Sequence, residues 1–143
     1  MKRHLARIAV PLAATAAVVA ATGTPAAAAS DADVDCGLTW SNEYKLYDPC
    51  GWVYFQSETG DGTEYLVLHD TNSDGYGVIV QNYRYDMADA GPYSGTVTSG
   101  KGTHKVWTLH MPEGTAIDFR ICPYTTAHGP YYSQCSNWVR GIA

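Results

Sequence analysis

From residue 52 onward, short apolar segments alternate with polar, turn-forming segments. The apolar segments are rich in Val, Ile, Tyr, Trp and Thr, and clusters of Gly, Asp, Asn and Pro separate them roughly every eight to twelve residues. This spacing is typical of an all-β sandwich or barrel. We expect seven strands, at residues 52–57, 64–69, 77–85, 95–98, 103–110, 115–123 and 133–142.

The clearest alternation of apolar and polar positions runs through residues 117–122. Because successive side chains of a strand point to opposite faces, three apolar residues share the core face: Ile117, Phe119 and Ile121. The outward face carries Asp118, Arg120 and Cys122. The aromatic residues that we expect to be buried first are Trp52, Phe55, Trp107, Phe119 and Trp138.

No stretch after residue 29 shows a sustained 3.6-residue apolar period, and no repeat or low-complexity linker divides the chain. The expected fold is therefore a single small antiparallel β-sandwich over residues 52–143, similar in architecture to immunoglobulin and fibronectin domains. Residues 30–51 lack a strand pattern. We expect them to form a disulfide-tied N-terminal arm that packs over the sandwich and covers an edge strand.

Residues 1–29 have the three parts of a secretory signal peptide. A basic start with Lys2, Arg3 and Arg7 precedes an apolar run, and an alanine stretch that ends at Ala29 supplies an A-x-A cleavage site. The apolar run is shorter than the roughly 20 residues of a membrane span. Removal of this segment leaves six Lys and Arg against fourteen Asp and Glu, a formal net charge of −8.

This acidic balance makes nucleic acid and anionic membrane surfaces poor partners, because both are negatively charged. We expect a secreted, extracellular monomer that does not insert into a membrane after cleavage.

All four cysteines lie after the predicted cleavage site, and an oxidising compartment favours their pairing. Four cysteines allow three connectivities. We favour the local pairs Cys36 with Cys50 and Cys122 with Cys135, since each closes a loop of about 15 residues, which stabilises the fold by roughly 3 kcal/mol. An antiparallel hairpin would set Cys135 opposite Cys122, and in that register Trp138 turns toward the core.

Several short motifs carry a resemblance to a known group of proteins. They are Asp70 with Ser73-Asp74-Gly75, Glu113-Gly114, Phe119-Arg120-Ile121-Cys122 and Cys135-Ser136-Asn137-Trp138-Val139. Over about the last 80 residues the chain resembles a group of small secreted proteins of actinobacteria. These motifs are turns, core residues and cysteines, so the resemblance implies a β-sandwich and no particular activity.

The segment that begins at Asp70 matches the first half of a calcium-binding loop. Asp70, Asn72 and Asp74 offer oxygen ligands at alternate positions, and Gly75 allows the sharp turn. The twelfth position is Gln81 instead of Glu, and strands are expected on both sides, so an EF-hand is excluded. A weaker calcium site and a polar hairpin without metal both remain open. No other cofactor is indicated.

Catalytic patterns are weak in this chain. No G-x-S-x-G motif is present, and two disulfides would leave no thiolate nucleophile. His104 and His110 share a strand face but stand about 20 Å apart at 3.3 Å per residue, too far to hold one ion. We therefore expect a protein without catalytic activity.

Aromatic residues are abundant, and several tyrosines fall in predicted loops. They form two groups: Tyr83, Tyr85 and Tyr93, and Tyr124, Tyr131 and Tyr132. A tyrosine offers a flat apolar face with a polar tip, which suits contact with proteins or sugars. Such residues also cover loop backbone, and exposure decides between the two roles.

Three functions are compatible with these features. The first is a non-catalytic binding protein that contacts a cell-surface protein or polysaccharide through its tyrosine-rich loops. The second is an inhibitor of a secreted hydrolase that inserts residues 125–130, and this requires that the loop project. The third is a small secreted enzyme, which requires acids or histidines that converge in a cleft.

Overall fold

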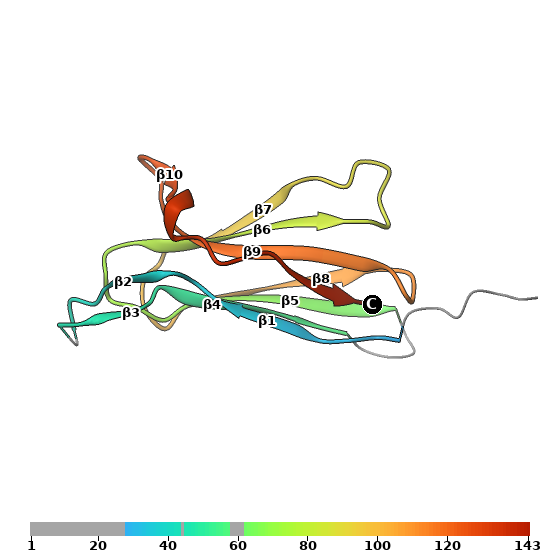
Figure 1. The fold of residues 1–143 in the computed structure, drawn as a ribbon, viewed down its shortest axis with the longest axis horizontal. Helices are drawn as coiled ribbons and strands as arrows, with labels where there is room; N and C mark the ends of the chain where they lie inside the picture. The colour runs from blue at the N-terminus through green and yellow to red at the C-terminus, as the bar shows by residue number, and fades with distance from the viewer. Residues whose placement is uncertain (1–27, 44, 58–61) are drawn as a thin grey trace, which may run out of the picture.

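The computed structural model describes residues 28–43, 45–57 and 62–143. The predicted signal peptide lies almost entirely outside this part, at residues 1–27. The described chain consists of antiparallel strands and one short 3-10 helix, which confirms the all-β prediction. Figure 1 shows two layers of strands packed face to face.

The first sheet has the strand order β1-β4-β5-β8. Its strands are β1 (Ala32–Asp35), β4 (Gly51–Gln56), β5 (Thr63–Asp70) and β8 (His104–His110). The second sheet has the order β10-β9-β6-β7, with β11 also paired to β9. Its strands are β6 (Gly77–Arg84), β7 (Tyr93–Val97), β9 (Ala116–Thr125), β10 (Gly129–Pro130) and β11 (Val139–Ile142).

This strand order differs from that of an immunoglobulin constant domain. There the first, second, fourth and fifth strands share one sheet. Here the β4–β5 and β6–β7 hairpins each stay within one sheet, and β8 and β9 return to pair with β5 and β6. The two-sheet antiparallel architecture is thus shared with immunoglobulin domains, whereas the connections are not.

The core lies between the sheets and follows the predicted alternation. Along β9, Ile117, Phe119 and Ile121 are fully buried. Phe55 of β4 is also fully buried, and its ring lies 6.4 Å from that of Phe119 across the sandwich. Burial of such side chains stabilises a fold by about 1.5–3 kcal/mol each. The alternation in β9 therefore positions the second sheet on the first.

The expectation that residues 30–51 lack strands is wrong. This segment contains β1, β2 (Leu38–Trp40) and β3 (Tyr47–Pro49). β1 pairs with β4, so the arm does cover an edge strand of the first sheet, as expected. The sequence does not predict β1 because three of its four residues, Ala32, Asp33 and Asp35, are of types that are depleted in strands.

The two sheets join at one side and stay apart at the other. Backbone hydrogen bonds between Ser30 and Ile142 connect the start of β1 to β11. At the opposite side β7 and β8 face each other without pairing, and the Trp107 ring lies directly against Gly95. A side chain at position 95 would overlap that ring, so glycine is required there by close approach.

Both predicted disulfides are present, Cys36–Cys50 and Cys122–Cys135. Cys122 lies on the outer face of β9, as its alternation requires, but it is fully buried instead of open to solvent. The reason is the 3-10 helix η1 (Tyr132–Gln134), which precedes Cys135 and is held over β9 by the disulfide. The expected strand at 133–142 is therefore reduced to β11.

The register of β11 corrects the placement of Trp138. Val139 pairs with Phe119, one residue away from the register that sets Cys135 opposite Cys122. A shift of one residue turns every side chain of a strand to its other face. Trp138 accordingly points outward and is 40% exposed, so its predicted burial is wrong. Trp52 and Trp107 are half-buried.

No helix in the described ranges is long and apolar enough to cross a membrane.

Candidate functional site

The outward side chains of β6, β9 and β11 form one continuous surface on the second sheet. On β9 this surface takes Asp118 and Arg120, which pair across the ladder with Tyr83 and Gln81 of β6. We call it the aromatic–arginine face and define it by its large side chains: Tyr83, Tyr85, Arg120, Tyr132, Trp138 and Arg140. Tyr83, Arg120 and Arg140 are outward residues of the three strands, and η1 carries Tyr132. Tyr85 directly follows β6, and Trp138 directly precedes β11.

Arg120 is held between two aromatic rings at the centre of this face. Its guanidinium carbon lies 4.7 Å from the ring centroid of Trp138 and 5.4 Å from that of Tyr132. Its Nε and one terminal nitrogen donate to Oε1 of Gln81 at 3.0 and 2.8 Å. These contacts fix the plane of the guanidinium before any partner arrives, which lowers the entropy lost on binding.

The charge of Arg120 has no acidic counterpart in the described part of the chain. None of the ion pairs there includes Arg120, and its only hydrogen-bond acceptor is the neutral amide of Gln81. A guanidinium has five N–H donors, so several remain available to a carboxylate. The face therefore offers an oriented cation in a chain whose net charge is negative.

Arg140, by contrast, is neutralised within the face. Its Nε and terminal nitrogen donate to the two carboxylate oxygens of Asp118 at 2.6 and 2.7 Å. The hydrogen bond from Arg140 is the largest cause that lowers the pKa of Asp118. Tyr85 donates to the same carboxylate at 2.8 Å, and this bond raises the pKa of the Tyr85 hydroxyl. This group can orient a partner but brings no unpaired charge.

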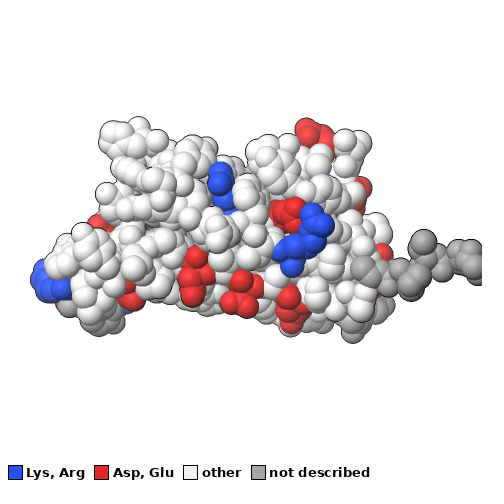
Figure 2. All heavy atoms as spheres, viewed as in Figure 1, with Lys and Arg blue, Asp and Glu red and all other residues white. Residues whose placement is uncertain are grey.

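The face lies in a shallow hollow. In Figure 1, β10 with η1 rises from one end of the second sheet, and the loop between β6 and β7 rises from the other end. Figure 2 shows the outline of the molecule indented between these two raised parts. It also shows basic side chains above β9 and β11 and a row of acidic side chains along the β1 edge below them.

The structure brings only some of the six candidate tyrosines together. Tyr83 packs on Trp138 at 5.1 Å, Tyr132 covers Arg120, and Tyr85 lies under Arg140, so these three belong to one surface. Tyr85 and Tyr132 are exposed, and Tyr83 is half-buried. Tyr83 and Tyr85 belong to the first predicted group, and Tyr132 belongs to the second. The two groups meet because η1 places Tyr132 over β9.

The other three candidate tyrosines lie elsewhere. Tyr131 packs edge-on against Tyr76 at 5.0 Å, and Tyr124 lies beside the base of the β9–β10 hairpin. Both are half-buried. Tyr93 faces inward from β7 toward the first sheet.

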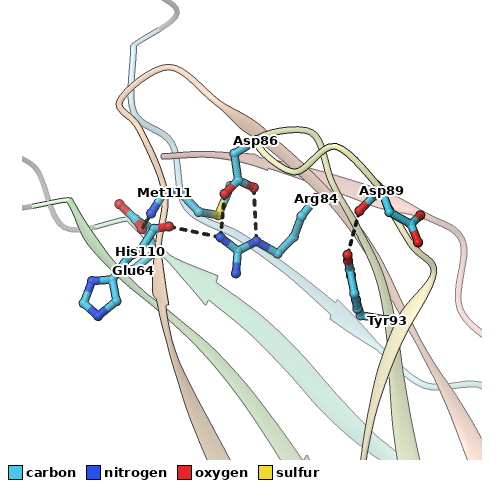
Figure 3. Close-up of polar contacts among 7 residues, drawn as sticks. All are labelled: Glu64, Arg84, Asp86, Asp89, Tyr93, His110 and Met111. Carbon is cyan, nitrogen blue, oxygen red and sulfur yellow. Dashed lines mark hydrogen bonds and ion pairs between the residues drawn. The ribbon is translucent and has the colours of Figure 1, made fainter.

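Tyr93 lines a mostly apolar cavity of about 280 Å³ between the unpaired edges of β7 and β8. The polar groups around its mouth already bind one another (Figure 3). Arg84 donates to Asp86 at 2.6 and 3.1 Å and to the backbone oxygen of His110 at 3.0 Å, and the Tyr93 hydroxyl donates to the backbone oxygen of Asp89 at 2.6 Å. These contacts leave few groups free to orient a ligand.

Sequence reasoning missed the two central residues of the face. Arg120 was predicted to point outward, but nothing local to it indicates an aromatic partner. Trp138 was expected in the core because the disulfide suggested a register one residue from the observed one. The signal that was available is the alternation Asp118, Arg120, which marks the outer face of β9 as charged.

Two acids of β5 are buried at opposite ends of the strand. Glu64 accepts a hydrogen bond from the Met111 backbone at 3.0 Å, and its other oxygen has no partner in the described chain. Burial is the largest cause that raises the pKa of Glu64. Burial also raises the pKa of Asp70, to about 6, with a further contribution from the charge of Asp74.

The predicted calcium ligands lie at the end of β5 and in the loop that follows it. Asp70 and Asn72 are fully buried, whereas Asp74 is half-buried. Asp74 accepts hydrogen bonds from Thr39 and from the Tyr76 backbone. In the ranges that the structure describes, no three His, Cys, Asp or Glu side chains gather to hold a metal ion, so a cation here would need amide or backbone oxygens.

Two histidines lie side by side on the first sheet. His69 and His104 pair across the first sheet, and their rings stack at 5.0 Å, with Trp52 stacked on the other side of His69 at 4.7 Å. Burial, followed by the neighbouring His104, lowers the pKa of His69. The stack covers the outer surface of the sheet opposite the aromatic–arginine face.

No family model and no curated protein matches the chain. Among solved structures, it is similar to a crystal structure of an endonuclease/exonuclease/phosphatase from Beutenbergia cavernae, with 16% identity and a TM-score of 0.38. The match covers 78% of this chain and 27% of that one, so the chain spans about a quarter of that protein's length. A likeness this weak indicates nothing about the function of this chain.

Proposed function

We propose that this chain is a secreted, non-catalytic binding protein that uses its aromatic–arginine face to hold an acidic segment of an extracellular protein. The observation that carries the proposal is the pre-oriented guanidinium of Arg120, clamped between Trp138 and Tyr132 without an acidic counterpart in the described chain. A partner carboxylate would complete this site with charge-assisted hydrogen bonds.

The composition of the face favours a protein over a polysaccharide. Trp, Tyr and Arg are the residues most enriched at the energetic centres of protein interfaces, and Lys and Glu are depleted there. The face has all three enriched types and no lysine. Trp138 is 40% exposed and Tyr132 is 61% exposed, which leaves apolar area for a partner to cover.

Secretion is supported by the signal-like order of residues 1–29 and by the two disulfides, which persist in oxidising compartments. The low number of basic residues favours an extracellular partner over nucleic acid.

The placement of the buried acids supports binding over glycoside hydrolysis. Glu64 and Asp70 are six positions apart on one face of β5, which corresponds to about 20 Å at 3.3 Å per residue. Acid pairs of glycosidases lie roughly 5–9.5 Å apart. These two residues therefore cannot act on one glycosidic bond.

The inhibitor hypothesis uses residues 125–130, which form the tip of the β9–β10 hairpin. Gly129 and Pro130 pair back onto Thr125 and Tyr124, so the exposed tip is limited to residues 126–128. The tip rises above the sheet (Figure 1) but is short for insertion into an enzyme cleft. We therefore treat inhibition as an outcome of the test and not as the proposal.

The test compares capture of secreted and cell-wall components by three immobilised proteins: wild type, Trp138→Ala and Val106→Ala. Val106 is a matched control because it is 49% exposed but lies on the outer face of the first sheet. We expect wild type and Val106→Ala to retain the same protein, and Trp138→Ala to lose it. Retention of a polysaccharide alone, or equal retention by all three proteins, would contradict the proposal. A fourth immobilised protein, changed at residues 126–128, tests the inhibitor hypothesis, and loss of the retained protein from this variant alone would also contradict the proposal.

A further inference from the structure

The end of β5 and the loop that follows it contain three buried oxygen atoms without a hydrogen-bond partner in the described chain. They are both carboxylate oxygens of Asp70 and Oδ1 of Asn72. Asp70 is 0% exposed and Asn72 is 1% exposed. A buried polar atom without a partner costs roughly 1–3 kcal/mol, and more when it is charged, so native folds rarely keep three of them together.

The orientation of the Asn72 side chain is fixed by its own donors. Its Nδ2 donates to the backbone oxygens of Thr39 and Asp48 at 3.3 and 3.2 Å and to Oγ1 of Thr39 at 2.9 Å. Rotating the amide by 180° would set Oδ1 against two carbonyl oxygens, which cannot donate. Oδ1 therefore faces away from the β2–β3 hairpin and stays without a donor.

The Asp70 carboxylate points into the same loop. After burial, the charge of Asp74 raises the pKa of Asp70 most, and the nearby backbone N–H of Asn72, which lies outside hydrogen-bonding geometry to either oxygen, lowers it. None of the ion pairs in the described ranges includes Asp70, and Lys101 pairs with Glu43 at the surface. The Asp70 carboxylate is therefore buried without a paired cation from the described chain.

The disulfide-tied arm holds this loop in place. Besides the Asn72 bonds, Thr39 donates to Asp74, and the Asn42 backbone donates to the oxygen of Ser73 at 3.0 Å. The Glu43 backbone donates to Oγ of Ser73 at 3.0 Å. Residues 39–43 therefore hold the loop through hydrogen bonds, although they precede it by about 30 residues in sequence. The loop oxygens are thus held in fixed positions, as the ligands of a binding site need to be.

We infer that Asp70 and Asn72 bind a calcium ion, with the carboxylate of Asp70 and Oδ1 of Asn72 as ligands and Asp74 as a nearby negative charge. Calcium accepts carboxylate and amide oxygens in flexible geometry, and magnesium demands a stricter octahedron. This ligand set includes at most two acidic side chains. It is therefore consistent with the finding that no three His, Cys, Asp or Glu side chains gather around a metal position in the described ranges. The remaining positions would be filled by backbone oxygens and water.

This site is distinct from the aromatic–arginine face. The calcium site lies in the loop between β5 and β6 beside the β2–β3 hairpin, and Arg120 lies on the outer surface of β9. Its expected role is to fix the hairpin and the loop, so calcium binding and partner binding can fail independently.

The test is a calcium titration of the disulfide-bonded protein, followed by thermal unfolding and by calorimetry. The variants are Asp70→Asn and, as a matched control, Glu64→Gln, which neutralises the other buried acid of the same face of β5. We expect a saturable rise in Tm for wild type and Glu64→Gln, half complete between about 0.1 and 1 mM calcium, the range of extracellular modules. Asp70→Asn should show no such rise, and magnesium should have a weaker effect on wild type.

A second readout covers the case in which Asp70→Asn does not fold. Backbone amide NMR shifts of the wild-type protein should move on calcium addition at residues 70–75 and not along β9. The inference is overturned if wild type shows no saturable response, if Asp70→Asn responds as wild type does, or if the shifted amides lie outside this loop.

Discussion

The guanidinium carbon of Arg120 lies 4.7 Å from the centroid of the Trp138 ring, although Arg120 belongs to β9 and Trp138 lies just before β11, beyond the disulfide-closed loop. A planar cation on an aromatic face contributes about 0.5–2 kcal/mol, more when water is excluded. Covering this pair with a partner would exclude water and bring a carboxylate to a cation that is already in position.

Two substitutions of Arg120 distinguish the contribution of its positive charge to binding from that of its planar guanidinium group. Arg120→Gln removes the cation, and Arg120→Lys keeps it but loses the planar fork that stacks between two rings. We expect both variants to weaken partner binding at least about tenfold, the effect of removing an interface hot spot. Affinity measured at rising NaCl should fall for wild type and stay flat for Arg120→Gln, because only the former binds through charge. Equal salt dependence for both would show that Arg120 is not the anion contact.

The Cys122–Cys135 disulfide is expected to matter for both stability and binding. Replacing both cysteines by serine should lower the free energy of unfolding by about 2–5 kcal/mol, measured by chemical denaturation. It should also abolish partner binding, because η1 and Tyr132 lose their tether over β9.

The matched control is the Cys36→Ser, Cys50→Ser variant, whose loop is nearly the same length. It should lose similar stability and keep its affinity for the partner. Loss of binding in both variants would mean that global stability, and not the position of η1, explains the result.

Gly95→Ala tests the open side of the sandwich. An added Cβ would lie 2.2 Å from Cζ2 of Trp107, so the ring or the strand must shift. Overpacking of this kind costs about 1–3 kcal/mol. Thermal unfolding should show a lower Tm for Gly95→Ala and little change for Ser94→Ala, whose side chain is on the exposed face of β7. A Tm unchanged in Gly95→Ala would show that Trp107 is free to move away.

Stability in the presence of a chelator should depend on the protonation of Asp70. Burial raises its pKa from 3.8 to about 6, so the folded protein holds this proton more tightly than the unfolded chain does. The associated stability is present at low pH and is lost as pH rises between about 4 and 6, a change on the order of 3 kcal/mol. Asp70→Asn should remove this step, so its unfolding free energy should exceed that of wild type most at pH 7. A constant difference between the two proteins from pH 4 to 7 would contradict this assignment.

The sequence pattern was sufficient for the strands whose side chains alternate strongly. The buried set of Ile117, Phe119 and Ile121 and both disulfide pairs were predicted correctly, since each depends on local spacing. The outward direction of Arg120 followed from the same pattern. The contact of Arg120 with Trp138 did not follow from that pattern, because it depends on the register of β11.

Features that depend on distant pairings were not predictable in the same way. A one-residue shift in β11 turned Trp138 from the expected core to the surface. The clamp of Asn72 by Thr39 joins positions 33 residues apart in sequence, and no periodic signal marks it. β1 was missed because its outward acids and small inward residues look like a solvated arm.

Site-specific photocross-linking in the secreted protein tests the proposed binding face most directly. A photoreactive residue would replace Tyr132, beside Arg120, or Val106 on the opposite sheet, and adducts would be identified by mass spectrometry. The proposed function predicts a protein adduct from position 132, lost when Arg120→Gln is added, and none from position 106. An adduct that forms equally from both positions, only from position 106, or from neither would contradict it.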